Sequence, residues 1–212
     1  MRILQIYDHI GINCGILSVV MNWYRHMDRE QIQFDFLVSH RMQLSYEEEI
    51  LALGGRVFYM SEDTCLRAAA MPRLAKNVKQ FLRSHAHRYQ AVHLHSLTFA
   101  FPYLFYAKKY GVPVRICHAH SLSLGNTRLK SLRNQWMVFP IKTTANAFLA
   151  CTREAGVKNY GPLGITDVRV VLNGVDSSRY GLGGTEHAAV RAELGIGEST
   201  FLVAHISNMS EI

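Results

Sequence analysis

The chain has 212 residues, enough for one large domain or for one and a half domains of ordinary size. Its hydrophobic fraction of 49% and charged fraction of 18% suit a packed globular core. Lys and Arg number 23 against 16 Asp and Glu, and the net charge of +7 favours anionic partners such as nucleotides, phosphorylated lipids or an acidic membrane face. No arginine-rich run or RNA-binding motif accompanies this charge, so we expect no nucleic-acid partner.

Cysteine spacing and hydropathy exclude several further classes. No C-x-x-C pair is present, which argues against a zinc knuckle or a redox pair and favours reduced thiols in a cytoplasmic protein. The N-terminal apolar run is broken by Asp8 and does not resemble a secretory signal. The aromatic stretch 91–107 is interrupted by His93, His95 and Pro102, so it is not expected to span a membrane.

The first 24 residues predict a strand, a turn and a helix. Residues 3–7 are an apolar run, and the turn that follows contains Gly11 and Gly15. Helical spacing then places apolar side chains at i, i+3, i+4 and i+7, namely Leu17, Val20, Met21 and Tyr24. A turn of this kind presents backbone N–H groups to phosphorylated ligands at a helix N-terminus. It does not match G-x-G-x-x-G, and a β–α turn without a ligand is the alternative.

Strand and helix patterns alternate along the rest of the chain. A capping box of Ser45 and Glu48 predicts a helix that Gly54 and Gly55 close, and Thr152 is predicted to cap a short helix. Other helices are predicted over 69–84, 99–110 and 128–138, and further strands over 33–38, 56–60, 91–95, 114–118, 147–150 and 168–171. This alternation predicts an α/β fold, a parallel sheet covered on both faces, with the strand at 3–7 central.

The composition changes near the end of the chain. Residues 177–186 are polar and glycine-rich, and we expect them to link a domain over 1–176 to the beginning of a second domain over 187–212. The second part contains a short helical pattern and the apolar run 201–206. A single strand has no stable fold of its own, so this run predicts the first strand of a domain that the chain does not complete.

Two His-x-His pairs end consecutive predicted strands: His93 with His95, and His118 with His120. Residues i and i+2 of a strand share a face, so the four imidazoles would gather near the turn at 8–15 if the strands are neighbours. Three interpretations stay open: catalysis or substrate contact, a zinc site, and histidines that only bond loop backbone. No acidic residue lies nearby to orient the rings, and we expect no metal at this cleft.

Basic and aromatic residues are mixed in two predicted helices, 99–110 and 128–142. This mixture suits peripheral contact with an anionic membrane or a lipid-linked acceptor. The alternative is a core-facing side with an ordinary solvated basic side.

Seven segments, in the same order and at similar spacing, resemble the N-terminal part of bacterial glycosyltransferase family 4. The resemblance covers Met1 to about Ile206, and the order of the segments makes it specific although each alone is weak. The segments are Val19–Arg25, Gln33–Val38, Leu53–Gly55, Val92–Ser96, Val114–Ser121, Ala150–Gly156 and Val171–Asp176.

The resemblance implies a GT-B architecture, in which two Rossmann-like domains face a cleft. This chain would be the N-terminal, acceptor-side domain with the start of the second domain. The implied reaction transfers a sugar from a UDP- or GDP-linked donor, with no cofactor or metal, to a glycan or lipid-linked acceptor in cell-envelope or exopolysaccharide synthesis. The implied location is the cytoplasm, including the inner face of the membrane.

The family's motifs also imply roles for individual residues. The turn near the donor diphosphate corresponds to Gly11, Asn13 and Gly15, and the active-site histidine after the fifth strand corresponds to His118 or His120. The turn departs from the common Gly-Gly-x-Glu pattern, because one glycine and the acidic residue are replaced.

Further positions follow from the same segments. We assign His95, Ser96 and Ser121 to the acceptor cleft, and Asn173 with Gly174 to the turn before the interdomain crossover. The donor-binding domain, with its basic residues and paired glutamates, is not in the chain, so the chain alone is expected to be inactive. The rival classes are a non-catalytic glycan or lipid-phosphate binding module and a zinc protein. Coding sequence after Ile212 with a Glu-x7-Glu pattern would decide for the enzyme.

Overall fold

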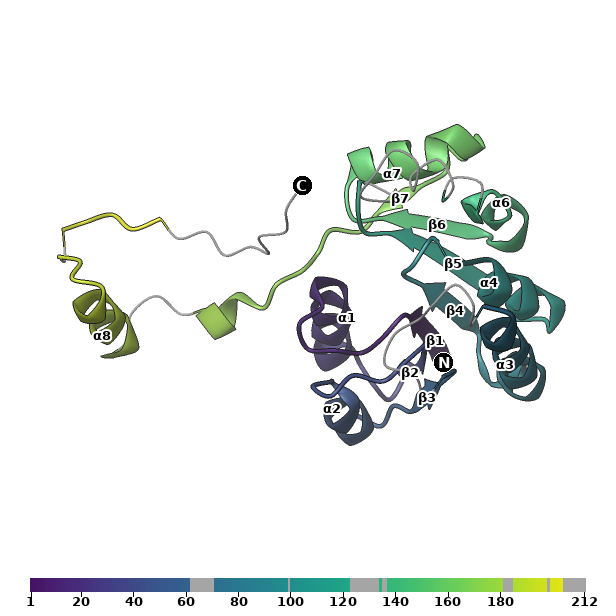
Figure 1. Cartoon of the computed structure of the whole chain (residues 1–212), viewed down its shortest axis with the longest axis horizontal. Coiled ribbons are helices and arrows are strands. Elements are labelled where there is room, and N and C mark those ends of the chain that lie inside the picture. Colours follow the sequence, from purple (N-terminus) through teal and green to yellow (C-terminus); the bar gives the residue numbers. More distant parts are fainter. Residues whose placement is uncertain are drawn as a thin grey trace. The chain divides into compact units, whose positions relative to one another are not determined.

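A computed structural model of the chain (Figure 1) describes residues 1–61, 71–98, 100–122, 134, 137–180, 185–197 and 199–203. Most of the predicted helix at 128–138 and half of the predicted strand at 201–206 lie outside these ranges, and residues 201–203 are irregular. The chain divides into two compact units, 1–174 and 175–212.

A sheet of seven parallel strands forms the first unit, as the alternating pattern predicted. Its order is β3-β2-β1-β4-β5-β6-β7, so β1 is an interior strand with β2 and β4 as neighbours. The strands are β1 (Arg2–Tyr7), β2 (Gln33–Val38), β3 (Val57–Tyr59), β4 (Ala91–Leu94), β5 (Val114–Ala119), β6 (Ala147–Ala150) and β7 (Arg169–Val170).

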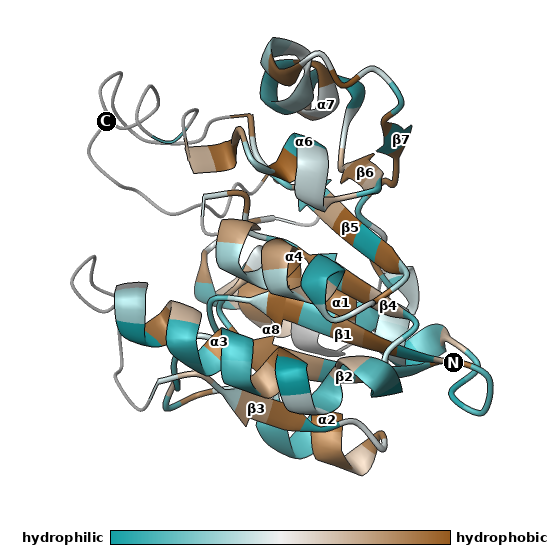
Figure 2. Cartoon of the chain, turned by 90° about the vertical axis from the view of Figure 1, so that its right-hand side faces the viewer, coloured by the Kyte–Doolittle hydropathy of each residue, from teal (hydrophilic) through white to brown (hydrophobic). Residues whose placement is uncertain are grey.

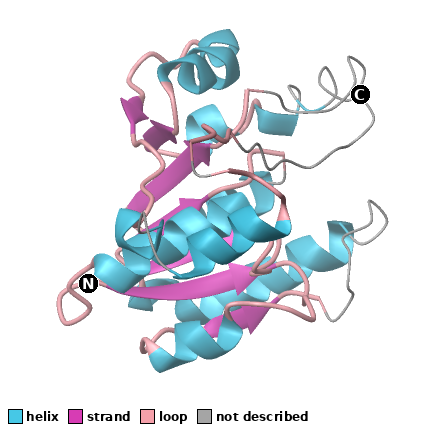
Figure 3. Ribbon diagram, turned by 90° about the vertical axis from the view of Figure 1, so that its left-hand side faces the viewer, coloured by secondary structure: helices cyan, strands magenta, loops and turns pink. Residues whose placement is uncertain are grey.

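Helices cover both faces of the sheet (Figures 1 and 3). Helices α1 and α2, which connect β1 to β2 and β2 to β3, lie on one face of the sheet. Helix α3 leads from β3 back to β4 across the other face, where α4, α6 and α7 also lie. The helices are α1 (Gly15–His26), α2 (Glu47–Ala52), α3 (Met71–His85), α4 (Ala100–Lys109), α6 (Ile141–Thr144), α7 (Arg153–Tyr160) and, in the second unit, α8 (Thr185–Glu193). The change of winding direction between β1 and β4 is a topological switch point, where open α/β sheets bind ligands.

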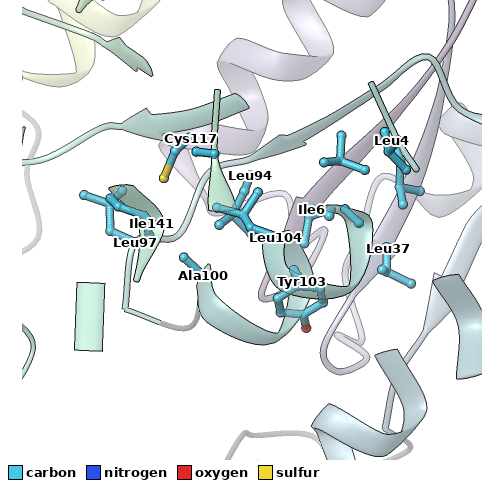
Figure 4. Packing of buried hydrophobic residues seen from close by; sticks show 14 of the residues in the cluster. Leu4, Ile6, Leu37, Leu94, Leu97, Ala100, Tyr103, Leu104, Cys117 and Ile141 are labelled. Carbon is cyan, nitrogen blue, oxygen red and sulfur yellow. The ribbon is translucent and has the colours of Figure 1, made fainter. Parts of the chain in front are cut away.

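Strand alternation divides the buried side chains of β1 between two cores. Leu4 and Ile6 point to the α3 and α4 face, where Figure 4 shows them near Leu37 and Leu104. The α1 face holds a second apolar cluster, including Tyr24. Figure 2 shows the strands as largely brown, hydrophobic ribbons, whereas α3 alternates between brown and teal as an amphipathic helix does.

Two helix starts test the predicted caps. Thr152 caps α7, since its Oγ1 accepts a hydrogen bond from the Ala155 N–H at 3.1 Å. The capping box at Ser45 is wrong, because α2 begins at Glu47 with Tyr46 at the N-cap. The Tyr46 N–H bonds to the Ile10 carbonyl, so the segment before α2 is held against the loop after β1 and starts the helix one residue later.

No helix within the described ranges combines the length and the apolar content needed to cross a bilayer.

Gly55 provides a test of the packing on the α1 face. A Cβ at this position would lie 2.6 Å from the Phe34 carbonyl oxygen and 2.8 Å from the Tyr24 hydroxyl. We therefore expect Gly55→Ala to lower the free energy of unfolding by about 1–3 kcal/mol, measured by urea denaturation. Gly161→Ala is the matched control, because a Cβ there meets no atom within 4 Å. Equal stability of the two variants would contradict this account of the packing.

Candidate functional site

A pocket of about 200 Å³ lies at the topological switch point, beside the carboxyl ends of β1, β4 and β5. Its position matches the place where α/β sheets bind their ligands. Four residues assigned to the cleft or to catalysis from the sequence come together here: His95, Ser96, His120 and Ser121. The other lining residues are Tyr7, Ile16, Leu97 and Thr98.

The histidines form two hydrogen-bonded pairs rather than one cluster of equivalent rings. His95 Nδ1 lies 2.8 Å from His120 Nε2, and His95 Nε2 lies 2.8 Å from the side-chain oxygen of Gln5. His93 Nε2 lies 3.1 Å from His118 Nδ1 in the second pair. The first pair therefore connects the pocket to β1.

The two candidates for the active-site histidine differ in exposure. His120 is half-buried and lines the pocket, whereas His118 is 0% exposed. The indole of Trp23 in α1 lies parallel to the rings of His93 and His118, at centroid distances of 6.3 and 6.1 Å. The pair of His93 and His118 is thus enclosed between the sheet and α1.

Burial keeps all four imidazoles neutral. Desolvation lowers the pKa of His120 to about 4. It also lowers the pKa of His93 to about 3 and that of His118 to about 2, and repulsion from neighbouring imidazoles adds to both shifts. The pKa of His95 lies well below its usual value for the same reasons. At neutral pH each ring therefore has one N–H donor and one lone-pair acceptor.

Three of these rings could hold a metal ion. Nitrogen atoms of His93, His95 and His118 lie within 4.8 Å of one another. A tetrahedral zinc with Zn–N bonds of about 2.0–2.1 Å needs nitrogens about 3.4 Å apart. The His93 and His118 nitrogens are 3.1 Å apart and bond to each other, so this hydrogen bond would have to break before both could bind a metal ion.

The turn after β1 differs in detail from the predicted phosphate loop. The N–H groups of Gly11, Ile12 and Cys14 are already bonded, to His9 Nδ1, to the Leu44 carbonyl and to the Gly11 carbonyl. These N–H groups are not free for a phosphate, which corrects part of the expectation.

The two glycines of the turn differ in the space around their Cα atoms. A Cβ at Gly11 would lie 3.1 Å from His9 Nδ1, so the chain itself favours glycine there. A Cβ at Gly15 would meet no atom within 4 Å. Gly15 begins α1, and the next residue, Ile16, lines the histidine pocket.

Gly11 and Asn13 line a different pocket, of about 610 Å³. Its other walls are His9 and the segment from Arg41 to Leu44. The structure therefore separates the turn residues predicted as one group: Gly15 is next to a residue of the histidine pocket, and Gly11 and Asn13 face the neighbouring pocket.

Residues Asn173 and Gly174 do not form the predicted turn, because residues 171–176 are irregular backbone. The Val171 N–H bonds to the Ala150 carbonyl and extends the pairing of β7 with β6. The carbonyl of Gly174 accepts a hydrogen bond from Asn22 Nδ2 of α1 at 3.3 Å. These two bonds hold the segment without a chain reversal.

The sequence patterns did not identify Gln5 and Trp23 as residues of the site. Gln5 is the single polar residue inside the apolar run of β1, and this position in the sequence was the available signal. Trp23 gave no signal of its own, since an aromatic residue on an amphipathic helix usually packs in a core.

A Rossmann-like parallel sheet with a pocket at its switch point is the architecture of one half of a GT-B glycosyltransferase. Among solved structures, Anabaena Alr3699/HepE in complex with UDP matches 92% of this chain and 50% of its own length, with a TM-score of 0.64 and 14% identity. The lipopolysaccharide outer core galactosyltransferase WaaB in its apo form matches 83% of this chain and 46% of its own length, with a TM-score of 0.59 and 16% identity.

Sequence comparison gives the family. The sequence model of Glycosyltransferase Family 4 matches residues 14–179. EpsF of Bacillus subtilis (strain 168), a protein named as a glycosyltransferase, is 32% identical over 217 residues, which cover 100% of this chain and 55% of EpsF. The chain belongs to glycosyltransferase family 4, and it spans about half the length of this relative.

The neutral imidazoles predict a pH-dependent stability. As pH falls below 6.5, the ordinary pKa of histidine, the unfolded chain binds protons that the folded chain does not take up until pH nears 4 or below. The free energy of unfolding should therefore fall with pH, by roughly 1.4 kcal/mol per pH unit for each histidine. Urea denaturation at a series of pH values measures this slope.

The double variant His93→Gln with His118→Gln separates these histidines from the other titrating groups. Its stability should depend less steeply on pH, because two of the four buried imidazoles are gone. The same slope in both proteins would show that the histidines are charged, or exposed, in the folded state.

Proposed function

We propose that this chain is the acceptor-side half of a glycosyltransferase that moves a sugar from a nucleotide-sugar donor to a glycan or lipid-linked acceptor. The observation that carries the proposal is the pocket at the switch point, where a neutral His120 stands beside Ser96 and Ser121. Hydroxyl and imidazole groups around a small pocket suit a sugar, since each sugar hydroxyl both donates and accepts hydrogen bonds. Family membership supports the same reaction class.

In this proposal His120, rather than His118, contacts a hydroxyl of the sugar or the acceptor. His120 lines the pocket, whereas His118 is buried and bonded to His93. A neutral imidazole can accept the hydroxyl proton in a hydrogen bond without adding a buried charge. His95 and the two serines would complete the wall of the acceptor cleft.

The donor is proposed to be a UDP- or GDP-linked sugar whose diphosphate passes beside Gly15. The open space at this glycine supports the position, because a backbone without a Cβ allows close approach at a helix N-terminus. A fold neighbour that was solved with UDP supports a nucleotide ligand. We propose that no metal takes part, because the histidine nitrogens already bond to one another.

The proposed domain boundaries are those expected from the sequence: 1–176 for the acceptor-side domain, 177–186 for the linker and 187–212 for the start of the donor-binding domain. The chain's match to only 55% of EpsF supports a longer enzyme. Residues 1–212 alone would then lack most donor contacts and transfer no sugar. We place the enzyme in the cytoplasm, in cell-envelope or exopolysaccharide synthesis, and the fold neighbour WaaB, a lipopolysaccharide galactosyltransferase, supports this context.

Activity of the protein expressed from its complete open reading frame tests the proposal. We expect His120→Gln to lower kcat for sugar transfer about a hundredfold, because the hydrogen-bond acceptor at the reacting hydroxyl is displaced. His87→Gln, at an exposed position outside the pocket, is the control and should retain full activity. Full transfer by His120→Gln would reject the role of His120. Glycan binding by the whole protein without any transfer would favour the binding-module alternative.

A membrane contact of α4 is a second, finer proposal. Phe101 and Phe105 are 44% and 39% exposed, with ring centroids 5.3 Å apart, and Lys108 and Lys109 lie in the last turn of the same helix. Aromatic rings beside lysines suit the interface of an anionic bilayer, where an acceptor with a lipid anchor would be found.

Sedimentation with vesicles tests this contact. Vesicles rich in phosphatidylglycerol should bind the chain, and Phe101→Ala with Phe105→Ala should weaken the binding severalfold because apolar area at the interface is lost. Leu51→Ala, which removes an exposed apolar side chain from α2, is the control. Equal binding to vesicles of neutral phosphatidylcholine, or no effect of the double variant, would contradict the proposal.

A further inference from the structure

Gln5 is a buried polar residue in an otherwise apolar strand. It is 2% exposed and lies between Leu4 and Ile6, which pack in the core on the other face of the sheet. Its side-chain oxygen lies 2.8 Å from His95 Nε2, and its side-chain nitrogen has no partner among the described residues. A buried amide that is only half satisfied destabilises the fold, because the unpaired group has lost its hydrogen bonds to water. A structural role alone therefore explains Gln5 poorly.

The chain of hydrogen bonds from Gln5 determines where the protons of His95 and His120 lie. The side-chain oxygen of Gln5 only accepts, so His95 carries its proton on Nε2. His95 Nδ1 is then a lone pair, which accepts from the Nε2–H of His120. His120 Nδ1 is left without a proton. It is a buried atom of a residue that lines the pocket, and nothing in the described part of the chain bonds to it.

We infer that Gln5 is a positioning residue, whose side-chain oxygen acts through His95 to present His120 with Nδ1 as a hydrogen-bond acceptor for a substrate hydroxyl. The inference rests on the proposed function for the identity of that hydroxyl as one of a sugar or its acceptor. If the Gln5 amide turned by 180°, its nitrogen would donate to His95. The protons of His95 and His120 would then each move to the other ring nitrogen, and Nδ1 of His120 would become a donor. One amide side chain thus selects between two opposite roles for the same histidine.

The second histidine pair lacks such an anchor. His118 Nε2 is buried with no partner within the described ranges, and Gln5 bonds to His95 rather than to His93. The tautomers of His93 and His118 are therefore not set from β1. The pair whose tautomers Gln5 fixes, His95 with His120, is therefore the pair that reaches the pocket.

Nitrogen NMR of the histidine rings tests the inference without any activity. In the wild-type chain, Nδ1 of His120 should show the resonance of an unprotonated nitrogen, and Nε2 that of a protonated one. Gln5→Met and Gln5→Leu both remove the acceptor at similar volume, and either should give a mixture of the two tautomers at His120. In the complete protein, kcat should fall about tenfold to a hundredfold with KM nearly unchanged, as for outer partners that orient metal-bound histidines.

Gln5→Glu is the conservative variant, since it keeps an oxygen that accepts from His95 Nε2. At mildly alkaline pH it should restore both the tautomer and kcat, as the aspartate of a Ser-His-Asp triad orients its histidine. Ser39→Ala is the matched control, because it removes a different buried hydrogen bond, to the Tyr103 hydroxyl, and should leave the His120 resonances unchanged.

Three outcomes would overturn the inference: an unchanged His120 tautomer in Gln5→Met and Gln5→Leu, equal effects of Gln5→Glu and Gln5→Leu, or stoichiometric zinc in the purified chain. A failure of the proposed function looks different. In that case His120→Gln would keep full transfer activity while the tautomer of His120 still followed the residue at position 5.

Discussion

The parallel pairing of β4 with both β1 and β5 is the constraint on which the candidate site depends. It places Gln5, His95 and His120, which lie far apart in the sequence, in a single line of hydrogen bonds across three strands. The same pairing creates the switch point, because the chain winds away from β1 in one direction and from β4 in the other. A pocket and its polar wall thus come from one feature of the topology.

Burial then gives the histidines their chemistry. Four imidazoles this close together at the carboxyl ends of β4 and β5 cannot all be charged, and desolvation lowers the pKa of each. Neutral rings must share donors and acceptors, and each hydrogen bond restricts the tautomer of the next ring. The pocket therefore offers directed hydrogen bonds rather than positive charge, which suits a sugar hydroxyl better than a phosphate.

Local patterns predicted most of the fold. The β strands follow from the periodicity of their side chains. The cap at Thr152 follows from a side-chain oxygen three residues before the N–H that it accepts from. Neither depends on residues far away in the sequence. The capping box at Ser45 and the turn at Gly174 were wrong because long-range contacts took precedence. The Ile10 carbonyl holds Tyr46, and Asn22 in α1 bonds the Gly174 carbonyl.

The sequence by itself determined the class of fold, the family and the two His-x-His pairs, since these depend on spacing along the chain and on the period of a strand. Only the tertiary structure decided which histidine lines the pocket and that Gln5 bonds to His95. It also decided that Gly11 lines a second pocket, whereas Gly15 lies next to Ile16 of the histidine pocket. The physical reason is that burial and hydrogen-bond partners across strands depend on register and on the helix packed above them. A linear pattern of residues contains neither.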